Sequence, residues 1–571
     1  MVFNSYFFIF IYLPILLIGW FGLNRVNRRT ADVFLIGMSL WFYGCFGWAA
    51  LTVLLISIGM NYVLGRGIEG RRGRLAAGVI ANLVLLAWFK YATDLISSAA
   101  EAAGTDTSAL PTFLTLAMPV GLSFYTFTQI SYLIDRYRGE AAQEAFLSYA
   151  LYASYFPKLV EGPITRYEEI ASQFRDETRR KFCAEHFTRG LILLVLGMGK
   201  KVLIADVLSP AVSHGLSSAY YLDTLSVIVT MLGYALQLYM DFSGFCDMAM
   251  GISWMLNIDL PLNFDAPLRS TSYTDFWRRW HMTLNRFFTQ YIYIPLGGSR
   301  RGVARTFRNT VLVFLLSGIW HGTGATYLAW GAVNGVLVFL GSRYRKYTAQ
   351  KKSSVTADAG ASRTAAAGRS SVSAVSALTD AGAAIHANET SASPAATESG
   401  GSAGANDDTG RSSLQPTPAD SAACRDSGRI SRRHMLSDGL RRVRTIALFL
   451  LTLILFGASS LNEAFVIFRQ LFVPRFPGWL YRMAGQLDTA EFWVINKAVS
   501  LLAPQLADPA ALAELLLVML IALVLVLQPR TAVQTARTMK LTPRNAVLIA
   551  LLAVWCITSM SGVSTYIYFQ F

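Results

Sequence analysis

Long apolar runs recur along this chain and restrict its fold more than any other feature. Stretches such as 75–96 and 191–208 have roughly the 18–25 residues that a helix needs to cross the hydrocarbon of a membrane. Their apolar residues do not alternate with period two, as the strands of a membrane barrel would. We therefore predict an all-α polytopic membrane protein.

The basic residues sit mainly in short loops between the apolar runs. The formal net charge of +15 therefore reflects the enrichment of Lys and Arg in cytoplasmic loops and not a nucleic-acid partner. Following these loops along the chain predicts a multi-pass protein with its N- and C-termini outside. The cysteines show no metal-ligand spacing, so we expect neither a metal site nor a disulfide framework.

The composition changes sharply after the first 345 residues. Ala, Ser, Thr and Gly dominate residues 348–438, and aromatic residues are absent there. Such a segment cannot bury enough apolar surface to order itself. We predict a membrane core over residues 1–345, a disordered cytoplasmic linker over 346–440, and C-terminal transmembrane helices over 441–571 that complete the core.

Three segments are predicted to depart from simple membrane-crossing helices. Residues 32–65 are short for two spans and have basic flanks, so we expect a tight helical hairpin that turns near 44–47. Residues 309–342 resemble them, with a turn over 318–324. Residues 146–164 contain two prolines, a glycine and two charged residues, which predicts a re-entrant segment enclosed by protein.

His321 is the candidate general base, because it is the one histidine embedded in an apolar segment. An ionisable group at membrane depth is costly and indicates function by default. The glycines at 318, 322 and 324 break the helix around it and allow close approach of another chain or ligand. Neutral imidazole can take a proton from a hydroxyl near pH 7. The alternative is a structural histidine that hydrogen-bonds a neighbouring helix.

The other polar candidates have stronger structural explanations. His281 ends the stretch Asp275–His281, predicted as an amphipathic helix of a kind that any membrane interface displays. Asp241 and Asp247 do not face one another on a helix, so each is expected to be bonded and structural. Lys158 and Glu161 can form a buried ion pair with each other, while Lys200 and Lys201, inside an apolar run, either snorkel or face a cavity.

No nucleophile elbow, phosphate loop or zinc-protease motif occurs in the chain. A polytopic transporter that carries a polysaccharide precursor, without acyl-transfer chemistry, is the main alternative class. It predicts inverted repeats or charges spread along several spans, and the chain shows no convincing internal repeat.

Several stretches, taken together and in order, resemble the membrane-bound O-acyltransferase family, specifically its bacterial alginate O-acetylation branch. They are Met1–Phe3, Pro119–Tyr125, Phe156–Tyr167, Asp241–Phe245, Asn263–Gly298, Trp320–Gly322 and Tyr568–Phe571. The resemblance implies a ring of about ten or more tilted transmembrane and re-entrant helices around a thin central catalytic region. It also implies an O-acyltransferase with His321 as the catalytic histidine and His281 as the second motif histidine.

The resemblance further implies that a short acyl group moves from a cytosolic thioester, acetyl-CoA, across a bacterial inner membrane. An extracytoplasmic acetyltransferase would then finish O-acetylation of an exopolysaccharide or cell-wall polymer. Membrane lipids are the remaining expected partners, and no metal is expected. The residues expected at the donor site or cavity, with Asn334 as a candidate oxyanion stabiliser, are Asp241, Trp277, Arg278, Trp280, Trp320, Asn334, Lys158 and Glu161.

Tyr566 and Tyr568 are expected at the outer surface, after the last span. An aromatic belt at the membrane interface accounts for them without chemistry. The alternative is an acyl relay, in which a phenol on a mobile tail accepts the acyl group, with His321 as base, and passes it to the partner enzyme.

Overall fold

The computed structural model describes residues 1–104, 117–370, 418–475, 478–487, 489–560 and 566. All regular structure in these residues is helical. Five of the described helices are long and apolar enough to cross a membrane, which confirms the prediction of an all-α polytopic membrane protein. They cover Trp48–Gly65, Arg72–Ala92, Thr224–Met255, Ala325–Gln350 and Pro504–Leu527.

The contacts divide the chain into two compact units. The first, here called the membrane unit, contains residues 1–342 and 440–571, and the second contains 343–439. Helix α17 (Ala325–Ser370) and helix α18 (Pro418–Gly457) each begin in one unit and end in the other. Both helices extend into the predicted linker, whose residues 371–417 lie outside the described part of the chain.

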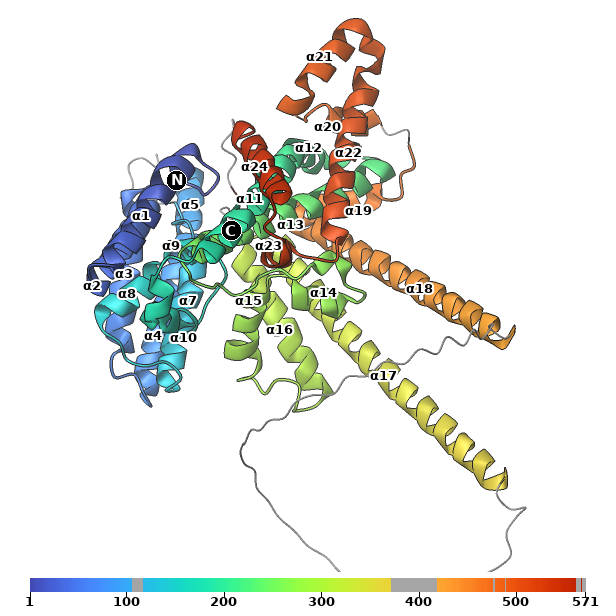
Figure 1. Cartoon of the computed structure of the whole chain (residues 1–571), viewed down its shortest axis with the longest axis horizontal. Helices are drawn as coiled ribbons and strands as arrows, with labels where there is room; N and C mark the ends of the chain where they lie inside the picture. Colours follow the sequence, from blue (N-terminus) through green and yellow to red (C-terminus); the bar gives the residue numbers. More distant parts are fainter. Residues whose placement is uncertain (105–116, 371–417, 476–477, 488, 561–565, 567–571) are drawn as a thin grey trace, which may run out of the picture. The chain divides into compact units, whose positions relative to one another are not determined.

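The N-terminal helices of the membrane unit confirm the first predicted hairpin (blue to cyan in Figure 1). Helix α2 ends at Gly44 and helix α3 begins at Trp48. Gly47 between them has a φ of +119°, a conformation that glycine adopts without steric cost. The elements of this group are η1 (Phe8–Tyr12), α1 (Leu13–Asn24), α2 (Arg28–Gly44), α3 (Trp48–Gly65), α4 (Arg72–Ala87), η2 (Trp88–Ala92), α5 (Thr93–Ala102) and α7 (Leu122–Tyr137).

The predicted re-entrant segment is short, broken and buried. Helix α8 (Phe146–Ser154) is followed by the single turn α9 (Phe156–Leu159) and then by irregular chain up to α10 (Tyr167–Arg175). The side chains from Phe156 to Ile164 are buried. Protein therefore surrounds the irregular backbone, as such backbone requires at membrane depth.

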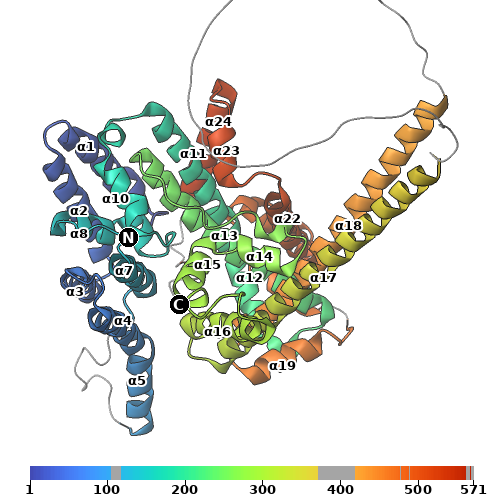
Figure 2. The same ribbon diagram turned by 90° about the horizontal axis from the view of Figure 1, so that it is seen from below.

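Helices α11 (Ala184–Lys200) and α13 (Thr224–Met255) lie side by side in both Figure 1 and Figure 2 and form the densest helix pair in the described structure. Glycines permit this approach. A Cβ atom on Gly190 would lie 2.5 Å from the Gly251 carbonyl oxygen, and one on Gly197 would lie 2.7 Å from that of Gly244. The neighbouring elements are η4 (Glu177–Arg180), η5 (Lys201–Ala205), α12 (Asp206–Ser217) and η6 (Ala219–Tyr221).

The helix predicted over Asp275–His281 is present as far as Arg279, but it does not continue to His281 as predicted. Helix α14 ends at Arg279, and His281 has a φ of +45° before the next helix starts. The second predicted hairpin is confirmed, because α16 ends at His321 and α17 begins at Ala325. The elements here are η7 (Pro267–Arg269), α14 (Tyr273–Arg279), α15 (Met282–Phe288), η8 (Thr289–Tyr293) and α16 (Val303–His321).

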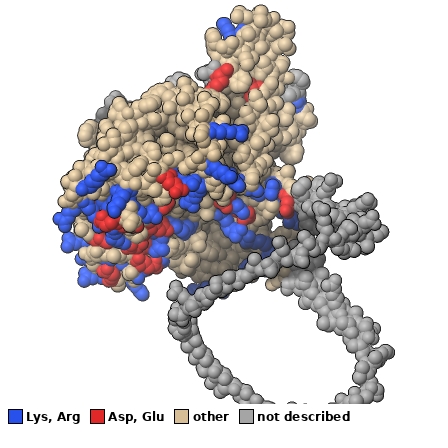
Figure 3. All heavy atoms as spheres, viewed as in Figure 1, with Lys and Arg blue, Asp and Glu red and all other residues tan. Residues whose placement is uncertain are grey.

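The C-terminal part of the membrane unit adds further helices, of which α22 is the most apolar candidate span. In the view of Figure 3, charged side chains gather in a band on one side and leave a broad uncharged surface beside it, as a membrane protein requires. The elements are α19 (Leu461–Gln470), α20 (Gly478–Ala484), η9 (Ala490–Phe492), α21 (Trp493–Leu502), η10 (Pro504–Leu506), α22 (Ala507–Leu527), α23 (Ala532–Thr538) and α24 (Pro543–Thr558).

Candidate active site

His321 is the last residue of α16, and aromatic rings enclose it. Its side chain is buried, and its ring centroid lies 4.4 Å from that of Trp320, 5.3 Å from Trp330 and 5.0 Å from Phe456. Glycine is required on both sides of the turn. A Cβ atom on Gly322 would lie 2.2 Å from the Tyr327 ring, and one on Gly318 would lie 2.3 Å from the Tyr327 carbonyl oxygen.

His281 also contacts the Trp320 ring. The His281 ring centroid is 6.2 Å from the Trp320 ring and 4.9 Å from the Phe242 ring. Its Nδ1 is 3.1 Å from the side-chain oxygen of Asn263. Burial in this apolar setting lowers the pKa of His281 to about 3, because the charged form loses its hydration. The ring is therefore neutral at physiological pH.

Both histidines line one narrow cavity. Its volume is about 30 Å³, enough for only one or a few water molecules. Trp277 and Trp280, two of the predicted lining residues, form part of its wall. The full lining is Leu238, Trp277, Trp280, His281, Leu284, Asn285, Phe288, Val313, Phe314, Ser317, His321, Trp330, Phe449, Leu453 and Phe456.

Two other predicted residues lie away from this cavity. The Arg278 side chain is 67% exposed and pairs with Asp275 at 2.5 Å. Asn334 is buried, and its side chain accepts a hydrogen bond from the Tyr273 hydroxyl and donates one to the Trp330 carbonyl oxygen at 2.7 Å. The amide of Asn334 is therefore engaged with its neighbours rather than directed at the cavity.

The buried lysines between α11 and α12 pair with aspartates. Lys201 Nζ lies 2.6 Å from Asp241 Oδ1 and 2.9 Å from Asp206 Oδ1. Lys200 Nζ lies 2.5 Å from Asp247 Oδ2. Both aspartates are therefore bonded, as expected, and neither lines the cavity that the two histidines share. Both lysines thus form buried ion pairs, and Lys200 also faces a cavity, which was one of the two predicted alternatives.

Lys158 and Glu161 form no ion pair with each other in the described structure, so that prediction is wrong. The Lys158 ammonium instead lies 3.6 Å from the centroid of the Tyr152 ring, close enough for a cation–π contact. Both carboxylate oxygens of Glu161 are buried without a hydrogen-bond partner. The irregular chain after α9 separates the two side chains that a regular helix would bring together.

Lys90 is a site residue that the sequence analysis missed. Its ammonium donates a hydrogen bond to the carbonyl oxygen of Trp320, and the Tyr91 hydroxyl donates one to that of Ile319 at 2.6 Å. Both residues belong to the π-helical turn η2, a distortion that is frequent at functional sites. The signal was available, because Lys90 is a charged residue inside the apolar run 75–96.

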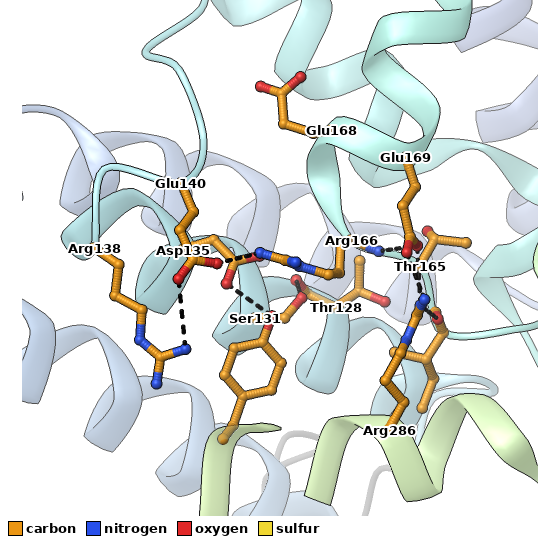
Figure 4. A network of polar contacts seen from close by, with 12 residues as sticks. Thr128, Ser131, Asp135, Arg138, Glu140, Thr165, Arg166, Glu168, Glu169 and Arg286 are labelled. Carbon is orange, nitrogen blue, oxygen red and sulfur yellow. Dashed lines mark hydrogen bonds and ion pairs between the residues drawn. The ribbon is translucent and has the colours of Figure 1, made fainter. Parts of the chain in front are cut away.

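A network of charged side chains ties three parts of the membrane unit together (Figure 4). Arg166 Nε donates to Asp135 Oδ2 at 2.9 Å, and the Tyr291 hydroxyl donates to Asp135 Oδ1 at 2.8 Å. Arg286 of α15 donates to Glu169 Oε2, also at 2.9 Å. These bonds join α7, α10 and the α15–η8 segment, so they support the loop that carries His281.

A second, larger cavity of about 500 Å³ lies elsewhere in the membrane unit. It is bounded by α11, α13, α22 and α24, and its lining is mostly apolar, with Lys200 and Tyr239 in the wall. Neither His281 nor His321 lines it. Its size is that of a typical ligand pocket, and its lining includes Lys200, Glu491 and Arg530, whereas the two candidate histidines line the smaller cavity.

Tyr566 is fully buried, so the expectation that it lies at the outer surface is wrong. Its ring centroid is 5.0 Å from that of Phe245, and the Lys201 ammonium lies 4.3 Å from the ring centroid. Tyr568 lies outside the described residues.

Comparison with known proteins identifies the class to which this chain belongs. Residues 80–357 match the membrane-bound O-acyltransferase family. The chain is 35% identical to the peptidoglycan O-acetyltransferase of Helicobacter pylori over 381 residues, which cover 61% of this chain and 72% of that protein. The chain belongs to the membrane-bound O-acyltransferase family, and it is an O-acyltransferase. The transporter alternative is therefore set aside.

Two further relatives act on different polymers according to their names. The probable alginate O-acetylase AlgI of Pseudomonas aeruginosa is 37% identical over 348 residues, covering 59% of this chain and 65% of the relative, slightly under two thirds of its length. The teichoic acid D-alanyltransferase of Bacillus subtilis is 26% identical over 241 residues, covering 41% of this chain and 61% of that protein. The predicted family and enzyme class are confirmed.

Proposed function

We propose that this protein moves a short acyl group, acetyl, from cytosolic acetyl-CoA across the membrane for O-acetylation of an exopolysaccharide or cell-wall polymer. The observation that carries the proposal is the convergence of His281 and His321 on one cavity. The named relatives support a polymer acceptor, since they include a peptidoglycan O-acetyltransferase and probable alginate O-acetylases.

The proposed chemistry is attack of a hydroxyl on the thioester, with His321 as general base. The imidazole takes the hydroxyl proton while the oxygen bonds to the thioester carbonyl carbon. Collapse of the tetrahedral intermediate breaks the carbon–sulfur bond, and the imidazolium returns the proton to the leaving thiolate. The products are an ester and a free thiol. General-base catalysis of this kind typically supplies about 10²–10⁴-fold in rate.

The donor is proposed to enter along the aromatic cavity that His281 lines. A cavity of about 30 Å³ is smaller than an acetylated pantetheine arm, so the lining side chains must move apart on binding. His281, neutral because of its burial, is proposed to position that arm. The two histidines then act at two points of the same cavity.

The predicted topology leads to a proposed arrangement of the protein in the membrane. We propose that residues 1–345 and 441–571 form one ring of tilted and re-entrant helices in a bacterial inner membrane, with both termini outside and lipid around the ring. An extracytoplasmic acetyltransferase is proposed to complete the transfer to the polymer. The relay tyrosine is proposed to be Tyr568, because Tyr566 is buried.

The test uses purified protein in vesicles, with acetyl-CoA inside and a small hydroxylic acceptor outside that takes the place of the partner enzyme. The expected result is release of free thiol inside, coupled to acetylation outside, and loss of both in the inserted His321→Ala protein. His214→Ala is the matched control, because His214 stacks on Trp479 with ring centroids 5.3 Å apart and lies outside the cavity. Acetylation without thiol release, or full activity of His321→Ala, would refute the proposal.

A further inference from the structure

We propose that Asn263 is a positioning residue that holds the neutral His281 ring in the tautomer with its hydrogen on Nδ1. The accepting nitrogen of His281 is then Nε2. The role of this tautomer in donor binding rests on the proposed function. A ring nitrogen with a lone pair accepts a hydrogen bond from an N–H group, and the pantetheine arm of the proposed acyl donor carries amide N–H groups.

Asn263 is buried and contacts His281 and both of its following residues. Its backbone carbonyl accepts from the Met282 N–H at 2.9 Å, and its side-chain Oδ1 lies 3.1 Å from His281 Nδ1. The same Oδ1 lies 2.9 Å from the Thr283 hydroxyl oxygen and 3.3 Å from the Thr283 nitrogen. Asn263 therefore holds the histidine through its side chain, at the imidazole ring, and through its backbone, at the residue that follows.

The orientation of the Asn263 side-chain amide follows from a neighbouring group that can only donate a hydrogen bond. A backbone N–H can only donate, so the atom that meets the Thr283 N–H is the amide oxygen and not the nitrogen. The Thr283 hydroxyl oxygen already accepts from the Ile164 N–H at 3.0 Å, which leaves its hydrogen to donate to Oδ1. The amide nitrogen points the other way, toward Cys246 Sγ at 3.2 Å.

The tautomer of His281 follows from that orientation. A carbonyl oxygen has no hydrogen to give, so a hydrogen bond between Oδ1 and Nδ1 requires the hydrogen on Nδ1. Because the ring is neutral in its buried setting, its other nitrogen carries a lone pair. In this position His281 has a left-handed backbone conformation with a φ of +45°. Such a conformation is strained for a non-glycine residue and persists only where the surrounding structure enforces it.

The contact also connects His281 to the re-entrant segment. Ile164 belongs to the irregular chain after α9, and its N–H reaches Asn263 through the Thr283 hydroxyl. The ring orientation is thus held by two segments distant in sequence. Substitution of Asn263 by leucine therefore removes both the acceptor at His281 Nδ1 and the acceptor for the Thr283 hydroxyl.

The test is nitrogen NMR of the full-length protein in lipid nanodiscs with ¹⁵N-labelled histidine. The chain has 6 histidines, so the His281 signals are assigned by their loss in His281→Gln. We expect the wild-type ring to be protonated at Nδ1, and Asn263→Leu to shift it toward the Nε2-protonated tautomer. Asn263→Asp keeps an acceptor oxygen and should retain the wild-type tautomer. If the Leu variant does not fold, Asn263→Asp still tests the inference.

Kinetics separate the positioning role from a structural one. Asn263→Leu should raise the KM for acetyl-CoA by about 10–100-fold, by analogy with the loss found when a residue that orients a metal-binding histidine is removed, and Asn263→Asp should rescue much of the loss. Cys246→Ala, which removes only the contact to the other end of the amide, is the matched control and should leave the tautomer unchanged.

A wild-type ring protonated at Nε2, or an unchanged tautomer in Asn263→Leu, would overturn the inference. Failure of the proposed function is distinguishable from this, because it would appear as absence of thiol release from acetyl-CoA in the wild-type protein, whatever tautomer the spectra show.

Discussion

The hydroxyl of Tyr566 donates a hydrogen bond to the side-chain oxygen of Asn4 at 2.8 Å, so residues from opposite ends of the chain meet in the protein interior. Phe245 of α13 lies between the two segments, with its ring 5.0 Å from that of Tyr566 and 4.9 Å from that of Phe3. The Lys201 ammonium faces the same tyrosine ring. The two ends are therefore packed against the central pair of helices.

The Lys201–Asp241 ion pair beneath Tyr566 should be costly to break from one side. Both side chains are 1% exposed, and removing one member of a buried pair typically costs about 3–5 kcal/mol. Lys201→Met should lower the melting temperature of the detergent-solubilised protein strongly. Lys201→Met with Asp241→Leu should recover part of the loss, since no charge is then stranded at position 241. A double variant as unstable as the sum of its single changes would contradict this coupling.

Lys90 should matter for turnover through its contact with the end of α16. A cation near a helix C-terminus stabilises it by about 0.3–2 kcal/mol, and Lys90 supplies that charge one residue before His321. Lys90→Met should insert normally but reduce thiol release by roughly 10–100-fold, because a displacement of about 1 Å in a catalytic group can cost about 10²-fold.

Tyr91→Phe is the comparison for Lys90→Met. It removes only the neighbouring hydroxyl bond to Ile319, so its effect on thiol release should be smaller. Equal activity of Lys90→Met and the wild type would show that the contact holds the helices together without affecting the base.

The sequence predicted those features that depend on local chemistry. Glycine at the turns located both hairpins, and the position of His321 in an apolar segment marked the site. Features that depend on how two helices align with each other could not be predicted from the sequence. Lys201 and Asp241 were each noted as polar residues in apolar runs, but only the packing of α11 and η5 on α13 shows that they pair.

The errors have physical causes as well. The break at His281 carries no glycine, because side-chain and backbone bonds to Asn263 hold a left-handed residue there. Tyr566 looked like an interfacial residue because tyrosine is common in that position, whereas a buried hydroxyl can find a partner such as Asn4, far away in the sequence. Lys90 was overlooked inside a run that otherwise fits a membrane span.

Deleting residues 348–437 and joining the ends with a short Gly/Ser linker should preserve activity. The deleted residues belong to the unit of residues 343–439, separate from the unit that holds both histidines. The prediction is checked by thiol release from the purified deletion protein in vesicles. Inactivity of a correctly inserted deletion protein would show that these residues support the site, while a defect seen only in cells would indicate a cytoplasmic binding role.

The proposed acyl relay now makes different forecasts for the two C-terminal tyrosines. Tyr566 is held by Asn4 and packed against Phe245, so Tyr566→Phe should destabilise the protein by about 0.5–1.5 kcal/mol through the lost hydrogen bond without removing an acyl acceptor. Tyr568→Phe should leave stability unchanged and abolish transfer to the outer acceptor, because the phenol that forms the ester is gone.

Mass spectrometry of the C-terminal peptide decides between the relay and the aromatic belt. After incubation with acetyl-CoA, the wild-type peptide should gain one acetyl group, with the phenol proton passing to His321 and the thiol leaving. The Tyr568→Phe peptide should gain none, and Tyr566→Phe should still be acetylated. If no peptide is acetylated and Tyr568→Phe transfers normally, the phenol takes no part in the reaction, and interfacial anchoring is sufficient to explain Tyr568.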